Sequence, residues 1–282
     1  MRTCTFQSVL DRTCQLIGTL YTNLSAEDQA SVLGYIDQGT EKAWEFYWWP
    51  ELMLSELRYY RADYAALTAY TTGAEVYYPT TGKYYEALGA TTGNAPTNAT
   101  YWAEITDIDA TIDLEQSGQT VIGEVRMVAQ RDPLTDSRPG KLLIGLGPDG
   151  IYVKGCTVPT SVYVWFRTVK PAYTGATFDA GTVYTSGARK YYSSATPGFE
   201  GDFYVANDTT VAAESPETTP AKWDKVEFPK ILRESVAREA HYRYLVKDGA
   251  SIEALGRAGA DANGALIQEM HKIVGQQSQA NR

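Results

Sequence analysis

Apolar residues recur with a helical period near the start of the chain. Over residues 5–21 they fall on one side of a 3.6-residue repeat, which predicts a first helix. A second helix is expected to begin at Ser25, a suitable N-cap, with Asp28 in the capping-box position three residues later. Its apolar stripe runs on until Pro50, which cannot continue a helix.

The end of this second helix is crowded with aromatic residues in the stretch AWEFYWWPEL. A helix end that is apolar nearly all round packs one side on its own chain and leaves another for a neighbour. The aromatic residues that we expect at a core or subunit interface are Trp44, Phe46, Tyr47, Trp48 and Trp49.

Between residues 52 and 175 the pattern changes to alternation with a period of two. The segments VIGEVRMVAQ, KLLIGL, GIYVKG and SVYVWFRTV predict strands, and RDPLTDSRPG and GPDG supply turn residues between them. GLGPDG also fits the spacing GxGxxG, but it leads into a strand and contains Pro148, so we interpret it as a hairpin turn and not a dinucleotide site. The middle of the chain is therefore expected to be antiparallel β structure.

Helical periodicity returns after Phe228. Apolar residues recur every four positions up to Tyr244, and a second helical pattern follows a break at Asp248 and Gly249. Helices at both ends of the chain predict one helical domain that the chain leaves and re-enters.

One formula occurs twice in the chain. TGKYYEALGATTGNAPTNATYWAEI, residues 81–105, aligns with EGDFYVANDTTVAAESPETTPAKWDKV, residues 200–226, and each copy ends on a tryptophan followed by a β-branched residue. Two distant copies do not form a solenoid, which needs at least three stacked repeats. We expect two small β modules set into a larger protein.

These patterns predict an α+β fold: a helical domain built from both chain ends, a central antiparallel β domain and two small inserted β modules. The expected boundaries are 1–57 and 228–282 for the helical core, 58–69 and 107–170 for the central β domain, 70–106 for the first module, and 171–227 for the second.

Composition narrows the functional classes. The 282 residues carry a formal net charge of −9, which argues against a large nucleic-acid surface, although a short basic patch is compatible with it. The first residues lack a secretory signal pattern, no run of about 18 apolar residues occurs, and we expect no membrane association. Cys4, Cys14 and Cys156 are interpreted as reduced structural thiols, with the first two in the first helix.

Catalytic and metal-binding patterns are sparse. His241 and His271 are the two histidines, and His241 borders an apolar stripe, where a packing role is the simpler interpretation. The acidic stretch DIDATIDLE lacks the glycine and the closing glutamate of a calcium loop, which favours a solvated strand edge. We predict no catalytic residues, no cofactor, no metal and no enzymatic activity.

The repeated formula resembles chitin-type carbohydrate-binding modules through Val76, the stretch GKYY, Pro96 and Trp102. The second copy departs from this pattern because Asp202 replaces the lysine. Exposed aromatic rings can stack on sugars, whereas buried ones would build the module core. The residues in question are Tyr84, Tyr85, Trp102, Tyr204 and Trp223.

The rest of the chain resembles the head-to-tail adaptor (connector, or head-completion) proteins of tailed bacteriophages. The resemblance covers roughly residues 5–61, 120–171 and 228–279, with the aromatic helix end, the stretch VRMVAQRDPLTDSRPG and the C-terminal stretch YRYLVKDGASIEALG. It implies a virion neck protein, assembled in the bacterial cytoplasm, that forms a ring of about twelve copies beneath the portal and continues the DNA channel.

The same resemblance implies the partners. They are other copies of the chain, the portal protein and downstream tail or neck proteins, while DNA passes through without sequence-specific binding. The residues expected to dock on the portal are Ile252, Leu255, Leu266, Met270 and Ile273. The alternative hypothesis is a carbohydrate-binding protein that uses the two modules as paired sites.

Overall fold

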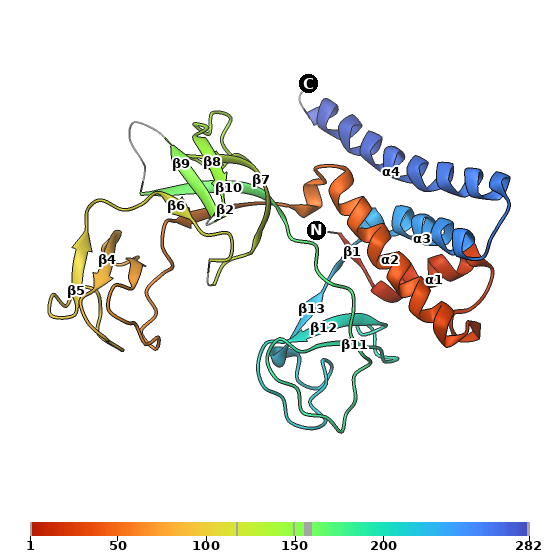
Figure 1. The fold of residues 1–282 in the computed structure, drawn as a ribbon, viewed down its shortest axis with the longest axis horizontal. Coiled ribbons are helices and arrows are strands. Elements are labelled where there is room, and N and C mark those ends of the chain that lie inside the picture. Colours follow the sequence, from red (N-terminus) through yellow and green to blue (C-terminus); the bar gives the residue numbers. More distant parts are fainter. Residues whose placement is uncertain (1, 117, 149, 155–159, 281–282) are drawn as a thin grey trace. The chain divides into compact units, whose positions relative to one another are not determined.

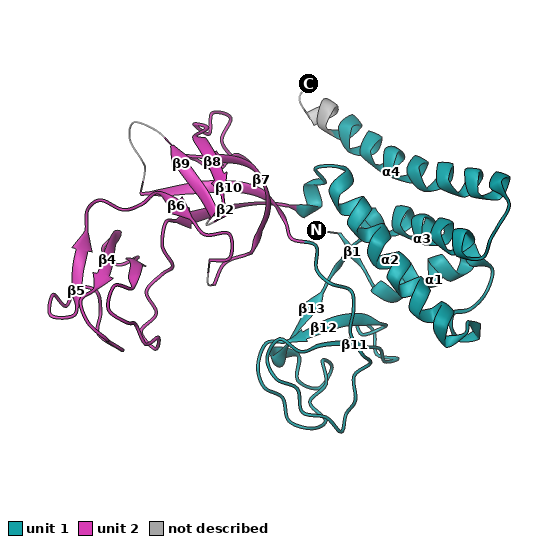
Figure 2. Ribbon diagram, viewed as in Figure 1, with its two compact units in different colours: residues 1–52, 170–282 teal, residues 53–169 magenta. Residues whose placement is uncertain are grey.

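The computed structural model describes residues 2–116, 118–148, 150–154 and 160–280, and Cys156 lies outside them. The fold is mixed α+β, with four α-helices and several small antiparallel sheets within these ranges (Figure 1). The chain forms two compact units: unit 1 contains residues 1–52 and 170–282, and unit 2 contains residues 53–169 (Figure 2).

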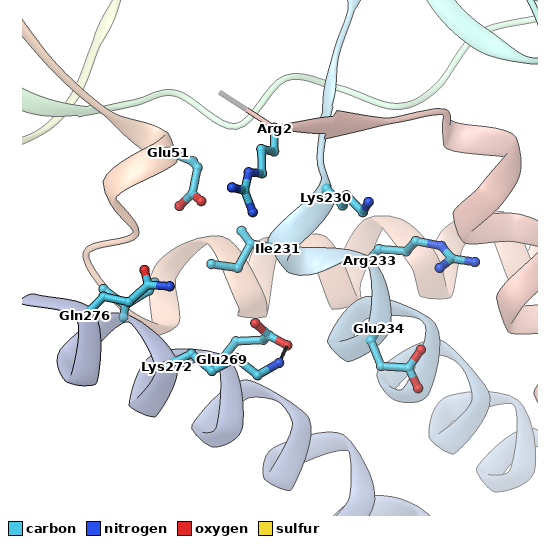
Figure 3. A pocket seen from close by; sticks show the side chains of 10 residues that line it. Arg2, Glu51, Lys230, Ile231, Arg233, Glu234, Glu269, Lys272 and Gln276 are labelled. Atoms are coloured by element: carbon cyan, nitrogen blue, oxygen red, sulfur yellow. Dashed lines mark hydrogen bonds and ion pairs between the residues drawn. The ribbon is translucent and has the colours of Figure 1, made fainter.

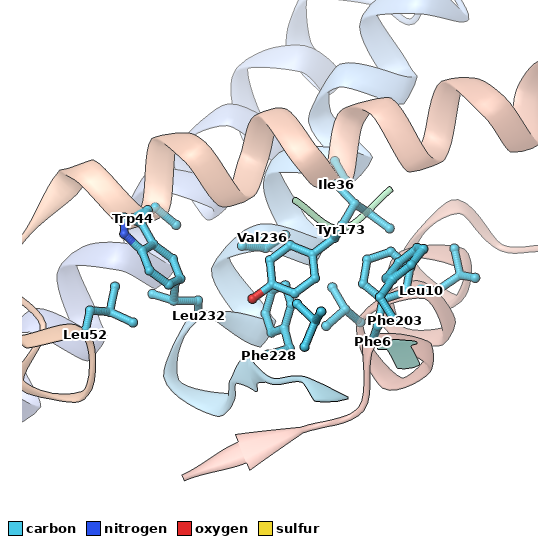
Figure 4. Packing of buried hydrophobic residues seen from close by; sticks show 14 of the residues in the cluster. Phe6, Leu10, Ile36, Trp44, Leu52, Tyr173, Phe203, Phe228, Leu232 and Val236 are labelled. Carbon is cyan, nitrogen blue, oxygen red and sulfur yellow. The ribbon is translucent and has the colours of Figure 1, made fainter. Parts of the chain in front are cut away.

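The helices of unit 1 come from both ends of the chain. Their bounds are α1 (Phe6–Ile17), α2 (Ala26–Phe46), α3 (Arg233–Lys247) and α4 (Ile252–Ala280). Helix α3 packs against each of the other three. The core between them is apolar and includes Leu10, Ile36, Leu232 and Val236 (Figure 4).

Local signals set the ends of the first two helices. The Ser25 hydroxyl accepts the Asp28 N–H at 3.1 Å, which confirms the predicted N-cap of α2. Helix α1 is shorter than expected because Gly18 takes a left-handed conformation at φ +88° and its N–H closes onto the carbonyl of Cys14. Cys4 precedes α1 in the short strand β1 (Thr3–Cys4), so the prediction that both cysteines share a helix was wrong.

Helix α2 ends earlier than the sequence pattern predicts. Tyr47 is already extended, at φ −148° and ψ 160°, so Tyr47, Trp48 and Trp49 lie outside the helix. A residue that precedes proline is driven out of the helical region, and here the chain turns before reaching Pro50. The Trp49 indole N–H then donates to the Ala43 carbonyl at 2.7 Å, so the turn folds back onto the helix.

The centre of unit 2 consists of two three-stranded antiparallel sheets. One has the order β2 (Met53–Tyr59), β10 (Ser161–Thr168), β7 (Ile122–Ala129), and the other β6 (Thr111–Ile112), β9 (Gly150–Lys154), β8 (Leu143–Gly147). Their inward residues, such as Val164, Phe166 and Ile151, form one buried cluster. Strands β8 and β9 pair directly, with Gly147 opposite Gly150, which confirms the hairpin interpretation of GLGPDG.

Each copy of the repeated formula, with the strand before it, forms its own three-stranded antiparallel sheet, and the two sheets have the same strand order. The first copy is β3 (Glu75–Tyr78), β4 (Lys83–Ala87) and β5 (Trp102–Ile105) in unit 2, and the second is β11 (Arg189–Tyr192), β12 (Asp202–Ala206) and β13 (Trp223–Val226) in unit 1. The registers agree: Ala87 faces Trp102 in the first and Ala206 faces Trp223 in the second.

The structural repeat extends further upstream than the expected module boundary at residue 70. Tyr64 and Phe178 each donate a backbone N–H, to the carbonyls of Tyr77 and Tyr191 respectively, at 2.8 Å in both copies. Tyr64 packs in the first module core and Phe178 in the second. We therefore define the first module as residues 62–105 and the second module as residues 176–226.

Unit 1 also joins the start of the chain to the exit of the second module. Strand β1 pairs with β14 (Phe228–Pro229), and the Lys230 N–H donates to the Arg2 carbonyl at 2.9 Å. The short 3-10 helix η4 (Lys230–Leu232) then leads into α3. The N-terminal segment is thereby fixed beside the start of α3.

Candidate interaction surfaces

The aromatic end of α2 divides into a buried and an exposed part. Trp44 and Trp49 belong to the core of unit 1. Phe46 is 43% exposed, and its ring stacks on Trp49 at a centroid distance of 6.4 Å. Tyr47 and Trp48 are half-buried. Of the five residues predicted for an interface, Phe46 therefore offers the most surface to another molecule.

The residues predicted to dock on a portal lie within about 60° of one another around α4, given 3.6 residues per turn, and most of them face the core of unit 1. Leu266 and Ile273 are buried in the core of unit 1, and Met270 packs against that core. Leu255 is half-buried, whereas Ile252 is 90% exposed. Leu266 and Ile273 hold α4 on the core of its own chain, so their assignment to a docking surface does not fit this conformation.

The outer face of α4 carries apolar residues that the sequence interpretation missed. Ile267 is 41% and Val274 46% exposed, and they lie within about 20° of each other around the helix axis, given 3.6 residues per turn. The seven-residue spacing of Ile267 and Val274 is the signal that could have identified them. We name Ile267 and Val274 the outer stripe of α4.

Ion pairs hold the helices of unit 1 together from within. Glu239 of α3 pairs with Lys42 of α2 at 2.7 Å and with Arg243 at 2.9 Å. Glu234 pairs with Arg12 of α1 at 2.9 Å, and the hydrogen bond from this guanidinium lowers the pKa of Glu234. These ion pairs therefore connect helices within the chain.

A charged hollow of about 370 Å³ lies where the N-terminal segment meets α3 and α4 (Figure 3). Lys272 and Glu269 pair at 2.5 Å, and Arg233 donates to the Ser8 carbonyl at 3.2 Å. The side chains of Arg2 and Glu51 both face the hollow. Its charges are mixed in sign, so it does not form the basic patch that a phosphate backbone requires.

An apolar hollow of about 380 Å³ lies between the second module and the helices. Phe203 and Tyr191 line it from the module, and Leu10, Leu20 and Leu33 from the helical side. It marks the seam along which the module packs on α1 and α2.

The five aromatic side chains considered for glycan contact are all buried. Trp102 and Tyr85 build the core of the first module, and Trp223 and Tyr204 that of the second. Tyr84 instead packs into the central cluster of unit 2. A sugar ring needs an exposed aromatic face to stack on, so the interpretation of these residues as glycan contacts was wrong.

Chemistry at titratable groups is limited in the described part of the chain. Burial lowers the pKa of His241, which matches a packing role on α3. Among the described residues, no group of three or more His, Cys, Asp or Glu side chains is arranged to hold a metal ion. Likewise, none of the helices within the described ranges combines the length and the apolar character that crossing a bilayer requires.

Comparison of this chain with protein-family models, with curated proteins and with solved structures gives no match.

Proposed function

We propose that this chain is a structural neck protein of a tailed bacteriophage, a non-enzymatic head-to-tail adaptor that forms a ring of about twelve copies beneath the portal. The sequence resemblance described above motivates the class. In this proposal the helical domain from both chain ends is the adaptor core, and the central β domain and two modules are inserted into it. DNA passes through the ring without sequence-specific binding.

One structural observation supports the proposal more than any other. Helix α4 has 29 residues and uses one side to cover its own core, while Ile267 and Val274 form an apolar stripe on its outer side. An apolar stripe on a long surface helix is suited to a partner, and here the partner is the portal. Phe46, at the end of α2, provides a separate apolar patch for a contact between copies, one of the two different patches that a ring closed by head-to-tail contacts uses on each subunit.

The charge of the chain is consistent with a channel. A net charge of −9 keeps phosphate binding weak, so DNA can move past without being held. Glycan binding is not proposed, because Trp102 and Trp223 would have to leave the cores that they build.

The experiment is mass photometry and negative-stain imaging of the purified protein, alone and with a purified portal ring. We expect rings, or monomers that become rings on the portal. The variant Ile267→Asp/Val274→Asp is expected to lose portal association while keeping its helical circular dichroism spectrum, since both side chains are surface residues.

The matched control is Leu67→Asp/Val183→Asp, which introduces the same charges at exposed aliphatic positions in the two modules. It should associate as the wild type does. A protein that stays monomeric with the portal, or a stripe variant that associates normally, contradicts the proposal.

A further inference from the structure

The two modules carry the same ion pair with its charges exchanged. In the first module Lys83 pairs with Glu104 at 2.8 Å, and in the second Asp202 pairs with Lys225 at 2.7 Å. The common register makes these positions equivalent. Lys83 and Asp202 each come directly after the repeated glycine, and each pair joins the second and third strands of its module. Swapping the two charges leaves the attraction between the paired side chains unchanged. The ion pair alone therefore does not explain why the second module has an aspartate at this position.

The surroundings of the two pairs differ. Lys83 and Glu104 are 52% and 41% exposed, and an exposed pair of this kind contributes little to stability. The Asp202 side chain is completely buried. A buried carboxylate is costly unless hydrogen bonds and a counter-charge satisfy it.

Asp202 is satisfied by a group outside its own module. Its Oδ1 accepts the backbone N–H of Phe6, the first residue of α1, at 2.8 Å. The first N–H groups of a helix have no partner within the helix, and a carboxylate there also interacts favourably with the helix dipole. No lysine could take this role, because an ammonium group cannot accept a hydrogen bond.

The neighbouring residues fix the same contact. The Gln7 N–H donates to the Gly201 carbonyl at 2.9 Å, and the Tyr191 hydroxyl donates to the Gln7 side-chain carbonyl. Phe203, the residue after Asp202, packs edge-on against Phe6 at a centroid distance of 4.9 Å (Figure 4). Backbone, side-chain and aromatic contacts therefore meet at the first turn of α1.

We propose that Asp202 is a latch: it caps helix α1 from the second module, so this module is a structural part of the helical domain. This inference goes beyond the function proposed above and does not depend on it. Burial raises the pKa of Asp202 despite the bonds from Lys225 and Phe6, as expected for a carboxylate held at an interface between two packed elements.

The test is residue-resolved amide hydrogen exchange of the full chain. Asp202→Ala should speed exchange of the Phe6 amide by at least about tenfold, the effect of losing a hydrogen bond to a charged group. Lys225→Ala removes the ion pair but keeps the cap, and the Phe6 amide should stay protected.

Two exchanged pairs separate capping from simple charge pairing. Asp202→Lys/Lys225→Asp copies the first module and restores an ion pair, but it should leave the Phe6 amide as unprotected as Asp202→Ala does. The matched control, Lys83→Asp/Glu104→Lys, should change exchange in neither unit. Asp202→Asn keeps an acceptor and should restore part of the protection even if Asp202→Ala unfolds the chain.

The latch is excluded if Asp202→Ala leaves the Phe6 amide protected. It is also excluded if the exchanged pair in the second module protects that amide as well as the wild type does. Neither outcome bears on ring formation or portal association, so the two proposals fail independently.

Discussion

The two modules share one fold and one strand register, but each packs on a different part of the chain. In each, the residue two positions after the repeated glycine turns away from the module core: Tyr84 packs on the central β structure and Phe203 on the helices. Tyr84 adds hydroxyl hydrogen bonds with the Tyr60 N–H at 3.0 Å and the Thr160 carbonyl at 2.7 Å. Both modules therefore pack through the same face. The polar contacts made at that face differ, because the part of the chain that it packs on differs.

The largest expected difference concerns the two module cores. Trp102→Ala and Trp223→Ala should each lower the free energy of unfolding by about 3–5 kcal/mol, because each removes the largest side chain of a small core. With Trp102→Ala, faster hydrogen exchange should be confined to unit 2, whereas with Trp223→Ala it should also reach α1. Equal exchange in α1 for the two variants would contradict the comparison, and Leu67→Ala, at an exposed position, serves as the control.

The repeated glycines provide the second test. Gly82 and Gly201 both have positive φ, at +68° and +118°. Gly82→Ala should cost about 1 kcal/mol from backbone strain alone. Gly201→Ala should cost about 2–4 kcal/mol, because a Cβ there would also lie 2.8 Å from the Gln7 Cβ and against the Tyr191 hydroxyl. Urea denaturation measures both, and similar values would mean that the second module sits more loosely on α1 than the structure indicates.

A smaller effect is expected for the hydroxyl of Tyr84. Tyr84→Phe should reduce the free energy of unfolding by about 1–2 kcal/mol, because the Tyr60 N–H loses its partner within a buried cluster. Tyr85→Phe is the matched control: its hydroxyl donates to the nearby Thr81 side chain at 3.1 Å, and the loss should be below about 1 kcal/mol. Thermal denaturation compares the two, and an equal loss would show that Tyr84 does not anchor the module through its hydroxyl.

The smallest effect is a difference in pH dependence. Because the folded-state pKa of Asp202 is raised, this group's contribution to stability is fully present below its unfolded pKa and is lost as the pH rises through the folded value. The stability of the wild type relative to Asp202→Asn should therefore fall over this acidic range. Denaturation series at several pH values check the sign, and a relative stability that rises with pH would contradict the raised pKa.

Much of the fold could be predicted because local signals determine it. The cap at Ser25, the break after α3 and the β8–β9 hairpin each depend on a few adjacent residues. The end of α2 was not predicted correctly. Two effects act there together: Pro50 disfavours a helical conformation at Trp49, and the Trp49 side chain folds back to bond the helix.

The full extent of the repeat was also detectable. ADYAALTAYTTGAEVYY, residues 62–78, aligns without a gap with ATFDAGTVYTSGARKYY, residues 176–192. The turn between β11 and β12 is longer than the turn between β3 and β4. An alignment that starts at Gly82 and Gly201 therefore does not extend back to these upstream stretches without a gap.

The surface residues were less predictable. Periodicity places Leu266 and Ile273 on one face of a helix, but it cannot tell whether that face meets the same chain or a partner. The Asp202 contact joins residues 196 positions apart and has no local signature. The departure of Asp202 from the lysine of the first module was nevertheless visible, and a changed charge at a repeated position was the clue.

The packing of α1 on α3 sets an order for events during synthesis. Unit 2 is one continuous segment and can fold once residue 169 has left the ribosome, whereas α1 must wait for a helix that begins at Arg233. At about 5–20 residues per second, α1 is complete roughly 10–45 s before its partner exists. Throughout that interval its apolar face lacks its final cover, so the nascent chain is most prone to aggregation or chaperone capture at its oldest end.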